Sequence, residues 1–177
     1  MKKIMVIGCP GSGKSTFSKE LHKITGIPLF HLDMMYWNSD RTTVGKSIFR
    51  EKLLNTIQMS EWIIDGNYGS TIETRLQACD TVIFLDYPLD VCLDGINARR
   101  GKARDDMPWV EDEEDPEFIE FIKNFNTQSK PQITDLLMKY SHKDIYIFTN
   151  RNEADEFLNH KKHKNHKIFL CSLVSED

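Results

Sequence analysis

A phosphate-binding pattern lies near the start of the chain, where Gly8, Gly13, Lys14 and Ser15 match the spacing G-x-x-x-x-G-K-[ST]. The glycines let backbone N–H groups turn towards phosphate oxygens, and the helix that follows adds the positive end of its dipole. In such loops the lysine contacts the β- and γ-phosphates and the serine hydroxyl holds Mg²⁺. A glycine-rich turn with a chance lysine is the alternative. The pattern predicts an ATP site that consists of Gly8, Gly11, Ser12, Gly13, Lys14, Ser15 and Thr16.

Two aspartates that follow apolar runs are candidates for the magnesium side of this chemistry. Phosphoryl transfer relies on a metal ion, on cations around the migrating group and on an oriented acceptor. Asp65 follows residues 62–64 and Asp86 follows residues 81–85, so either could order Mg²⁺-bound water. We favour Asp65, although either residue could instead stabilise a turn or cap a helix.

A group of polar and aromatic residues is expected to bind the acceptor. Asp33 follows an apolar run and could take a proton from an acceptor hydroxyl or hold it by a hydrogen bond; its alternative role is to stabilise a turn. The aromatic residues could line a pocket or only fill the core. The predicted acceptor site consists of Asp33, Trp37, Asn67, Tyr68 and Arg75.

Arginines are the expected cationic clamps, because a guanidinium presents a fork of donors to phosphate oxygens. The candidates are Arg41, Arg75, Arg99, Arg100 and Arg104. We favour Arg99 and then Arg104 for the nucleotide, because they flank an acidic segment, residues 105–115, with little apolar periodicity. We expect this segment to be a mobile, solvated loop and not a metal site, since its carboxylates lack regular spacing.

The elements that must position these residues alternate between strands and helices. Apolar runs predict strands at 4–7, 29–32, 62–64, 81–85 and 144–148. Helical spacing or capping signals predict helices at 15–21, 47–59, 88–101, 115–125, 131–140 and 153–158, with Asp115 as the N-cap that precedes Pro116. Continuous apolar strands separated by helices are typical of an α/β protein whose parallel sheet is covered on both faces. Ligands bind at the carboxyl ends of such strands. The phosphate-binding loop, Asp33, Asp65 and Asp86 are therefore expected at one edge of the sheet.

Size and charge narrow the class of protein. The chain has 177 residues, enough for a single domain with a full core. Its net charge of −4 gives no support for direct DNA binding, which normally needs a basic face. Its four cysteines form no C-x-x-C pair, which argues against a zinc site or a disulfide framework. No run has the length of a signal peptide core or a membrane span, so we expect a reduced, cytoplasmic protein.

The end of the chain, residues 159–177, carries two patterns without an assigned role. His160, His163 and His166 lie in a lysine-rich stretch, which is more typical of a solvated basic tail than of a metal site. Residues 167–174 are strand-like and could add an edge strand or mediate association.

These motifs resemble the P-loop kinases of the adenylate kinase type and, more closely, the FlaR-like DNA topology modulation proteins. The resemblance covers residues 1–158 and rests on four stretches, Gly8 to Thr16, His31 to Trp37, Trp62 to Tyr68 and Val82 to Pro88. It implies a P-loop NTPase fold with the strand order 2-3-1-4-5, Mg²⁺ and ATP, a small acceptor and a mobile lid, which we define as residues 101–117. It also implies that the turn at Thr149, Asn150 and Arg151 lies near the nucleotide base.

The chain departs from adenylate kinases at two points. Those enzymes follow their Asp-Gly with Phe-Pro-Arg, whose arginine holds the acceptor monophosphate, whereas Asn67-Tyr68-Gly69 follows Gly66 here, which argues against AMP as the acceptor. Relatives also carry two arginines four residues apart at the entry to the lid. Arg99 matches the second of these, but Gly95 occupies the first position.

Two functions are compatible with this sequence. The first is a small-molecule kinase that transfers the γ-phosphoryl of ATP to a nucleoside, nucleotide or hydroxy compound, with Lys14, Arg99 and Asp33 as catalytic residues. The second is a nucleotide-binding regulatory protein with little turnover. The sequence leaves open the identity of the acceptor, the choice between ATP and GTP, and the oligomeric state.

Overall fold

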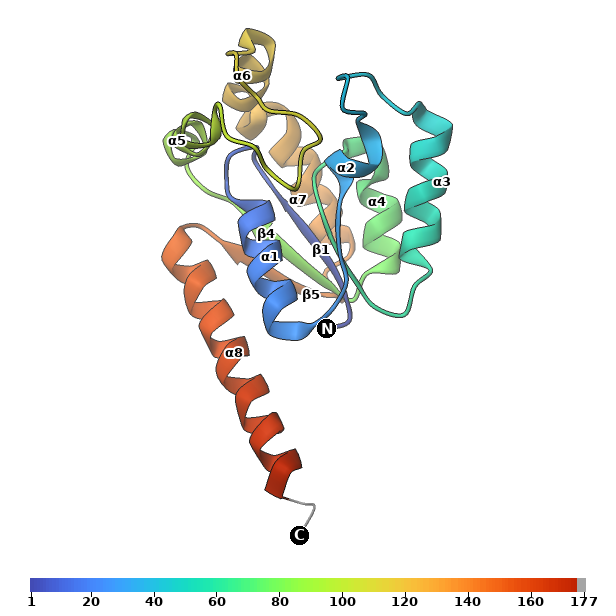
Figure 1. Ribbon diagram of the computed structural model, residues 1–177, viewed down its shortest axis with the longest axis vertical. Coiled ribbons are helices and arrows are strands. Elements are labelled where there is room, and N and C mark those ends of the chain that lie inside the picture. The colour runs from blue at the N-terminus through green and yellow to red at the C-terminus, as the bar shows by residue number, and fades with distance from the viewer. Residues whose placement is uncertain (175–177) are drawn as a thin grey trace.

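A five-stranded parallel sheet forms the centre of the protein, as seen in a computed structural model that describes the backbone of residues 1–174 and the side chains of residues 1–164 (Figure 1). The strand order is β2-β3-β1-β4-β5, and all neighbouring strands are parallel. The strands are β1 (Lys3–Gly8), β2 (Leu29–His31), β3 (Trp62–Asp65), β4 (Thr81–Leu85) and β5 (Asp144–Phe148). The α/β class and the strand order agree with the expectation.

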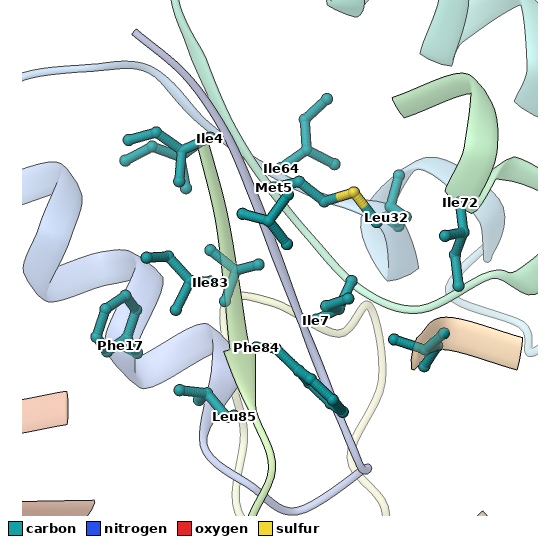
Figure 2. Packing of buried hydrophobic residues seen from close by; sticks show 14 of the residues in the cluster. Ile4, Met5, Ile7, Phe17, Leu32, Ile64, Ile72, Ile83, Phe84 and Leu85 are labelled. Carbon is teal, nitrogen blue, oxygen red and sulfur yellow. The ribbon is translucent and has the colours of Figure 1, made fainter. Parts of the chain in front are cut away.

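The core follows from the apolar strands. Residues 4–7 of β1 are fully buried because β1 is the middle strand and helices cover both faces of the sheet. Figure 2 shows Ile4, Met5 and Ile7 among side chains from other elements, with Phe17 on one side of the strand and Ile72 on the other. This packing fixes the carboxyl end of β1, where the phosphate-binding loop begins.

Helices connect the strands and cover the sheet. They are α1 (Lys14–Thr25), α2 (Leu32–Tyr36), α3 (Lys46–Ile57), α4 (Gly69–Ala78), α5 (Leu89–Arg99), α6 (Pro116–Lys123), the π-helix η1 (Phe125–Ser129), α7 (Lys130–Lys139) and α8 (Arg151–Val174). On one face α1 packs against α8, with the rings of Phe17 and Phe157 6.3 Å apart. On the other face α7 joins α4 through an ion pair of 2.5 Å between Lys139 Nζ and Glu73 Oε1. Figure 1 shows α1 in front of the sheet and α7 behind it.

Two expectations about the elements were wrong. Leu32 is the first residue of the short helix α2 and not the last residue of a strand, because β2 ends at His31, opposite Asp65 of β3. Residues 167–174, whose pattern was interpreted as strand-like, belong to α8, which continues to Val174. A formed helix gains one hydrogen bond for each residue that it adds, whereas a new edge strand would first have to close a loop back to the sheet. No helix of residues 1–174 is long and apolar enough to cross a membrane.

The lid lacks regular structure until α6 begins inside it, at Pro116. As expected, Asp115 caps α6: its side chain accepts hydrogen bonds from the backbone N–H groups of Glu117 and Phe118 at 3.0 Å each. At the other end Gly101, with φ 71°, donates its N–H to Glu111 O at 2.8 Å. These bonds fold the lid into a loop over the carboxyl edge of the sheet (Figure 1).

Candidate active site

A cavity of about 1290 Å³ opens at the carboxyl edge of the sheet. Its wall is formed by the phosphate-binding loop, the loop after β3, the end of β4, α2, α5, the lid and the start of α8. Most of the predicted site residues lie on this wall: Gly11, Ser12, Gly13, Lys14, Ser15, Thr16, Asp33, Trp37, Asn67, Tyr68, Arg99, Arg104 and Arg151. Gly8, Asp65 and Arg75 are not among the lining residues.

The phosphate-binding loop has the shape that its glycines allow. Gly11 has φ 84°, and a Cβ at this position would lie 2.0 Å from the carbonyl oxygen of Cys92 in α5. Gly13, at φ 91°, is the left-handed residue that directly precedes α1. Both positions exclude larger residues, one by contact and the other by backbone strain. The loop therefore presents the N-terminus of α1 to the cavity, where a phosphate group would bind.

Lys14 lies across the loop. Its Nζ donates to the carbonyl oxygens of Gly8 and Cys9 at 2.9 and 3.1 Å. Burial lowers the pKa of Lys14, and the negative charges of Asp65 and Asp33 oppose that effect. The ammonium group is thus held where a phosphate oxygen could replace a carbonyl as its partner.

Asp65 lies behind the cavity wall and is paired with His31. The β2–β3 register places these residues side by side, and His31 Nδ1 lies 2.8 Å from Asp65 Oδ1. Burial lowers the pKa of His31, but the hydrogen bond and charge of Asp65 more than compensate, so the pKa is raised. The second oxygen of Asp65, Oδ2, is buried and has no hydrogen-bond partner among the described residues. By contrast, Asp86 forms an ion pair of 2.8 Å with Lys130 Nζ, so its carboxylate already has a cation.

Asp33 and Tyr68 meet inside the cavity. The Tyr68 hydroxyl donates to Asp33 Oδ1 at 2.7 Å. Burial raises the pKa of Asp33, while the Tyr68 hydrogen bond and the charge of Lys14 lower it in part. Tyr68 has φ 42°, a conformation that costs a non-glycine residue free energy and is common at functional sites.

Arg75 does not contact the cavity, although it was expected at the acceptor site. Its guanidinium is fully buried and donates to the backbone oxygens of Gly66 at 2.8 Å, of Asn67, and of Thr71 at 3.4 Å. Burial lowers its pKa to about 9. The position of Arg75 four residues from Thr71 on α4 turns it back onto the loop after β3. It supports the wall from behind and is not available to an acceptor.

Asn67 links that loop to the phosphate-binding loop. Its side chain accepts from the Gly8 N–H at 3.1 Å and donates to the Gly8 carbonyl at 2.8 Å. Arg75 therefore holds the Asn67 backbone, and the Asn67 side chain holds the end of β1. The sequence indicated Asn67 as an acceptor residue but gave no sign of this bridge, because the bridge joins residues 59 positions apart.

Ion pairs join the acidic segment of the lid, which was expected to be a mobile, solvated loop, to α1 and α5. Glu111 Oε1 accepts a hydrogen bond from Arg99 Nη2 at 2.9 Å. Glu111 Oε2 forms ion pairs with Arg99 Nε at 2.9 Å and with Arg104 Nη2 at 3.1 Å. Lys19 of α1 pairs with Asp105 and also lies 3.9 Å from Asp106. Asp106 is 5% exposed, and although burial alone would raise its pKa, a Ser15 hydrogen bond and nearby cations lower it.

Several of these residues escaped the sequence analysis. Lys19, Asp106, Trp109 and Glu111 carry no motif, and only the fold brings them to the phosphate-binding loop or to the cavity. His31 lies in one of the stretches that carry the resemblance, but its pairing with Asp65 was not predicted. His160 and His163 are exposed on α8, and no group of three or more possible metal ligands occurs in the part of the chain that the structure describes. His166 lies outside the described side chains.

Comparison with known proteins places the fold and the site in context. No protein-family model matches the chain. A curated shikimate kinase from Flavobacterium johnsoniae is 27% identical over 173 residues, which covers 88% of this chain and 94% of the relative. A solved shikimate kinase from Acinetobacter baumannii, in complex with shikimate, matches with a TM-score of 0.59 and 15% identity over 99% of this chain and 95% of its own.

A deoxyadenosine kinase from M. mycoides, solved with bound dATP, also has this fold. It matches with a TM-score of 0.51 and 19% identity, over 91% of this chain and 98% of its own. These two classes of kinase act on chemically different acceptors, so the fold by itself does not select one. The fold, the phosphate-binding loop and the curated relative together support a P-loop phosphotransferase.

Proposed function

We propose that this protein is an ATP-dependent, small-molecule kinase whose acceptor binds beside Asp33. The observation that carries the proposal is the arrangement of Asp33 and Lys14 on one cavity wall, close enough for each charge to shift the pKa of the other. A carboxylate beside a phosphate-binding lysine suits the transfer of a phosphoryl group to a hydroxyl.

The transfer itself requires one bond to form and one to break. The acceptor hydroxyl oxygen forms a bond to the γ-phosphorus while the bond from that phosphorus to the β,γ-bridging oxygen breaks. ADP leaves, and the hydroxyl proton passes to Asp33. Lys14 and Arg99 hold the charge of the migrating group, and the N–H groups of residues 11–16 bind the phosphates. Arg104 stands beside Arg99, and Arg151 would lie near the base.

The donor atoms present fit Mg²⁺, which prefers oxygen ligands and usually keeps several waters. The Ser15 hydroxyl and the unpartnered Oδ2 of Asp65 are such donors, and Asp65, behind the wall, would act through water. When bound, the ion neutralises charge on the β- and γ-phosphates. The ion pair of Asp86 with Lys130 supports Asp65 as the carboxylate that serves Mg²⁺.

We also propose a relationship to the FlaR-like proteins within this class. It is supported by the role of the residues that suggested it. Asp33 and Trp37 line the cavity and His31 pairs with Asp65. The stretch Asp65 to Tyr68 supplies the Mg²⁺ candidate, the Asn67 bridge and the partner of Asp33. A regulatory role without turnover is the alternative, and the kinase relatives do not favour it.

The test is a transfer assay with a matched pair of lysine variants. ATP and Mg²⁺ are incubated with nucleosides, nucleotides and hydroxy acids, and ADP and product are followed by mass spectrometry. Lys14→Ala should lower kcat by at least about 100-fold while the circular dichroism spectrum is unchanged. Lys23→Ala, which removes an exposed lysine of α1, should have no effect. Undiminished turnover by Lys14→Ala would overturn the site, and tight ATP binding without any stimulating acceptor would favour the regulatory role.

A further inference from the structure

We infer that the acceptor of this kinase is an uncharged hydroxyl compound with a planar aromatic ring, of which a nucleoside is the simplest example. This inference rests on the proposed function and concerns the same site. Two observations carry it. The acceptor side of the cavity is built from aromatic rings, and on that side no cation among the residues that the structure describes is free to pair with an anionic acceptor.

The aromatic rings come from four separate parts of the chain. Tyr36 contacts Trp37, Phe49 and Tyr68 at ring distances of 5.0 to 5.2 Å, all with steeply inclined planes. Trp37 in turn contacts Trp109 of the lid at 5.1 Å and 89°. Phe49 is 5% exposed and backs the group, whereas Tyr36, Trp37, Tyr68 and Trp109 line the cavity.

The position of these rings fits a bound ring better than a hydrophobic core. Core aromatic residues are buried, but Trp37 and Trp109 are only half-buried and meet across the cavity, one from the segment after β2 and the other from the lid. Because the two indole rings are perpendicular, they form a corner. A planar ligand placed in this corner can stack on the face of one indole and contact the second indole with its edge. The hydroxyl of such a ligand would reach Asp33, which is joined to the same group through Tyr68.

The charges near the rings disfavour an anionic acceptor. Arg75, the residue expected to bind an acceptor phosphate, donates to backbone carbonyls and does not line the cavity. Arg41 forms an ion pair of 2.8 Å with Asp112. The carboxylate of Asp33 lies on the same wall. A carboxylate or phosphate on the acceptor would therefore be brought beside Asp33, and no unpaired arginine within the described side chains would offset the repulsion.

Matched acceptors test the inference. The panel contains adenosine and cytidine, their 5′-monophosphates, shikimate as a non-aromatic carboxylate, and glucose as an uncharged, non-aromatic polyol. Transfer is followed by ADP and product mass, and binding of each compound to the full chain is measured by calorimetry in the presence of ADP. We expect a nucleoside to have a kcat/KM at least about tenfold above that of its own monophosphate and of the other two classes.

Ring variants show whether the aromatic group is responsible. Trp109→Ala and Trp37→Ala should raise the KM for the nucleoside about tenfold or more, with a smaller change in kcat, because stacking holds the acceptor and does not perform the transfer. Trp109→Phe and Trp37→Phe, which keep an aromatic face, should restore most of the affinity. A merely structural role for the rings would instead lower thermal stability without this division between KM and kcat.

The outcomes separate the inference from the proposed function. Preferred transfer to shikimate, to glucose or to a monophosphate would keep the kinase and overturn the aromatic acceptor. Nucleoside binding that is weakened by Trp109→Ala, without any transfer, would support the aromatic site and overturn the kinase. If no compound bound and none stimulated ADP release, both would be overturned.

Discussion

The phenolic oxygen of Tyr68 lies 2.7 Å from Oδ1 of Asp33, and this hydrogen bond joins the loop after β3 to the first turn of α2. Tyr68 makes the bond from a backbone conformation with φ 42° at the N-terminus of α4. The free energy that this conformation costs is offset by the contacts of the loop, in which Arg75 holds the carbonyls of Gly66 and Asn67. Asp33 is thereby positioned in the cavity by residues that follow it by more than thirty positions.

Removal of the Tyr68 hydroxyl should shift the pH dependence of transfer. The pKa of Asp33 is raised by burial and by the charges of Asp65 and Asp106, and lowered by Tyr68 and Lys14. In Tyr68→Phe the lowering hydrogen bond is lost, so the acidic limb of the kcat/KM profile should move to higher pH, with a loss of about tenfold at neutral pH. Tyr36→Phe is the control, since no described hydrogen bond joins its hydroxyl to Asp33. If the acidic limb of the kcat/KM profile of Tyr68→Phe stayed at the wild-type pH, Asp33 would not be the base.

Arg75→Ala should lower the free energy of unfolding by about 3 kcal/mol, because it leaves buried carbonyl groups without donors. Urea denaturation measures this change. Arg50→Ala, which removes an exposed arginine of α3, should change stability by less than about 0.5 kcal/mol. If Arg75 instead bound the acceptor directly, Arg75→Ala would raise KM while stability stayed near that of the wild type.

The His31–Asp65 pair should stabilise the protein more in acid than in base. The folded-state pKa of His31 lies above its usual value of about 6.5. Its stabilisation is therefore fully present below about pH 6.5 and is lost as pH rises through the folded-state pKa. The difference in unfolding free energy between wild type and His31→Gln should decline from pH 6 to pH 9, as measured by urea denaturation. His142→Gln, at an exposed position, should show no such trend.

Asp106→Asn should loosen the lid. The variant weakens the interactions of Asp106 with Lys19, with Arg104 at 3.6 Å and with Ser15. Backbone amides of residues 102–115 should then exchange hydrogen faster, by about tenfold, while those of β1 are unaffected. Glu113→Gln removes a lid carboxylate that takes part in no ion pair among the described residues and should leave exchange unchanged. If hydrogen exchange in the lid were equally fast in the wild type, Asp106→Asn and Glu113→Gln, contacts other than those of Asp106 would hold the lid in place.

Local patterns in the sequence determined the parts of this protein that depend on neighbouring residues. The spacing of Gly8 to Ser15 predicted the phosphate-binding loop, apolar runs predicted the five strands, and Asp115 before Pro116 predicted the start of α6. Each of these signals acts within a few residues, because backbone conformation, helix capping and strand burial are decided locally. The strand order came from the resemblance to P-loop kinases and agrees with the sheet.

Only the tertiary structure decided what the side chains touch. Arg75 and Arg99 look alike in the sequence, yet α4 turns one inward onto backbone carbonyls while α5 places the other on the cavity wall. The acidic lid lacks a motif, but chain folding brings Lys19, Arg99 and Arg104 to its carboxylates. The Trp37–Trp109 contact likewise joins segments distant in the chain. Such contacts depend on strand register and helix orientation, which are set by the packing of the whole core, so a local pattern cannot encode them.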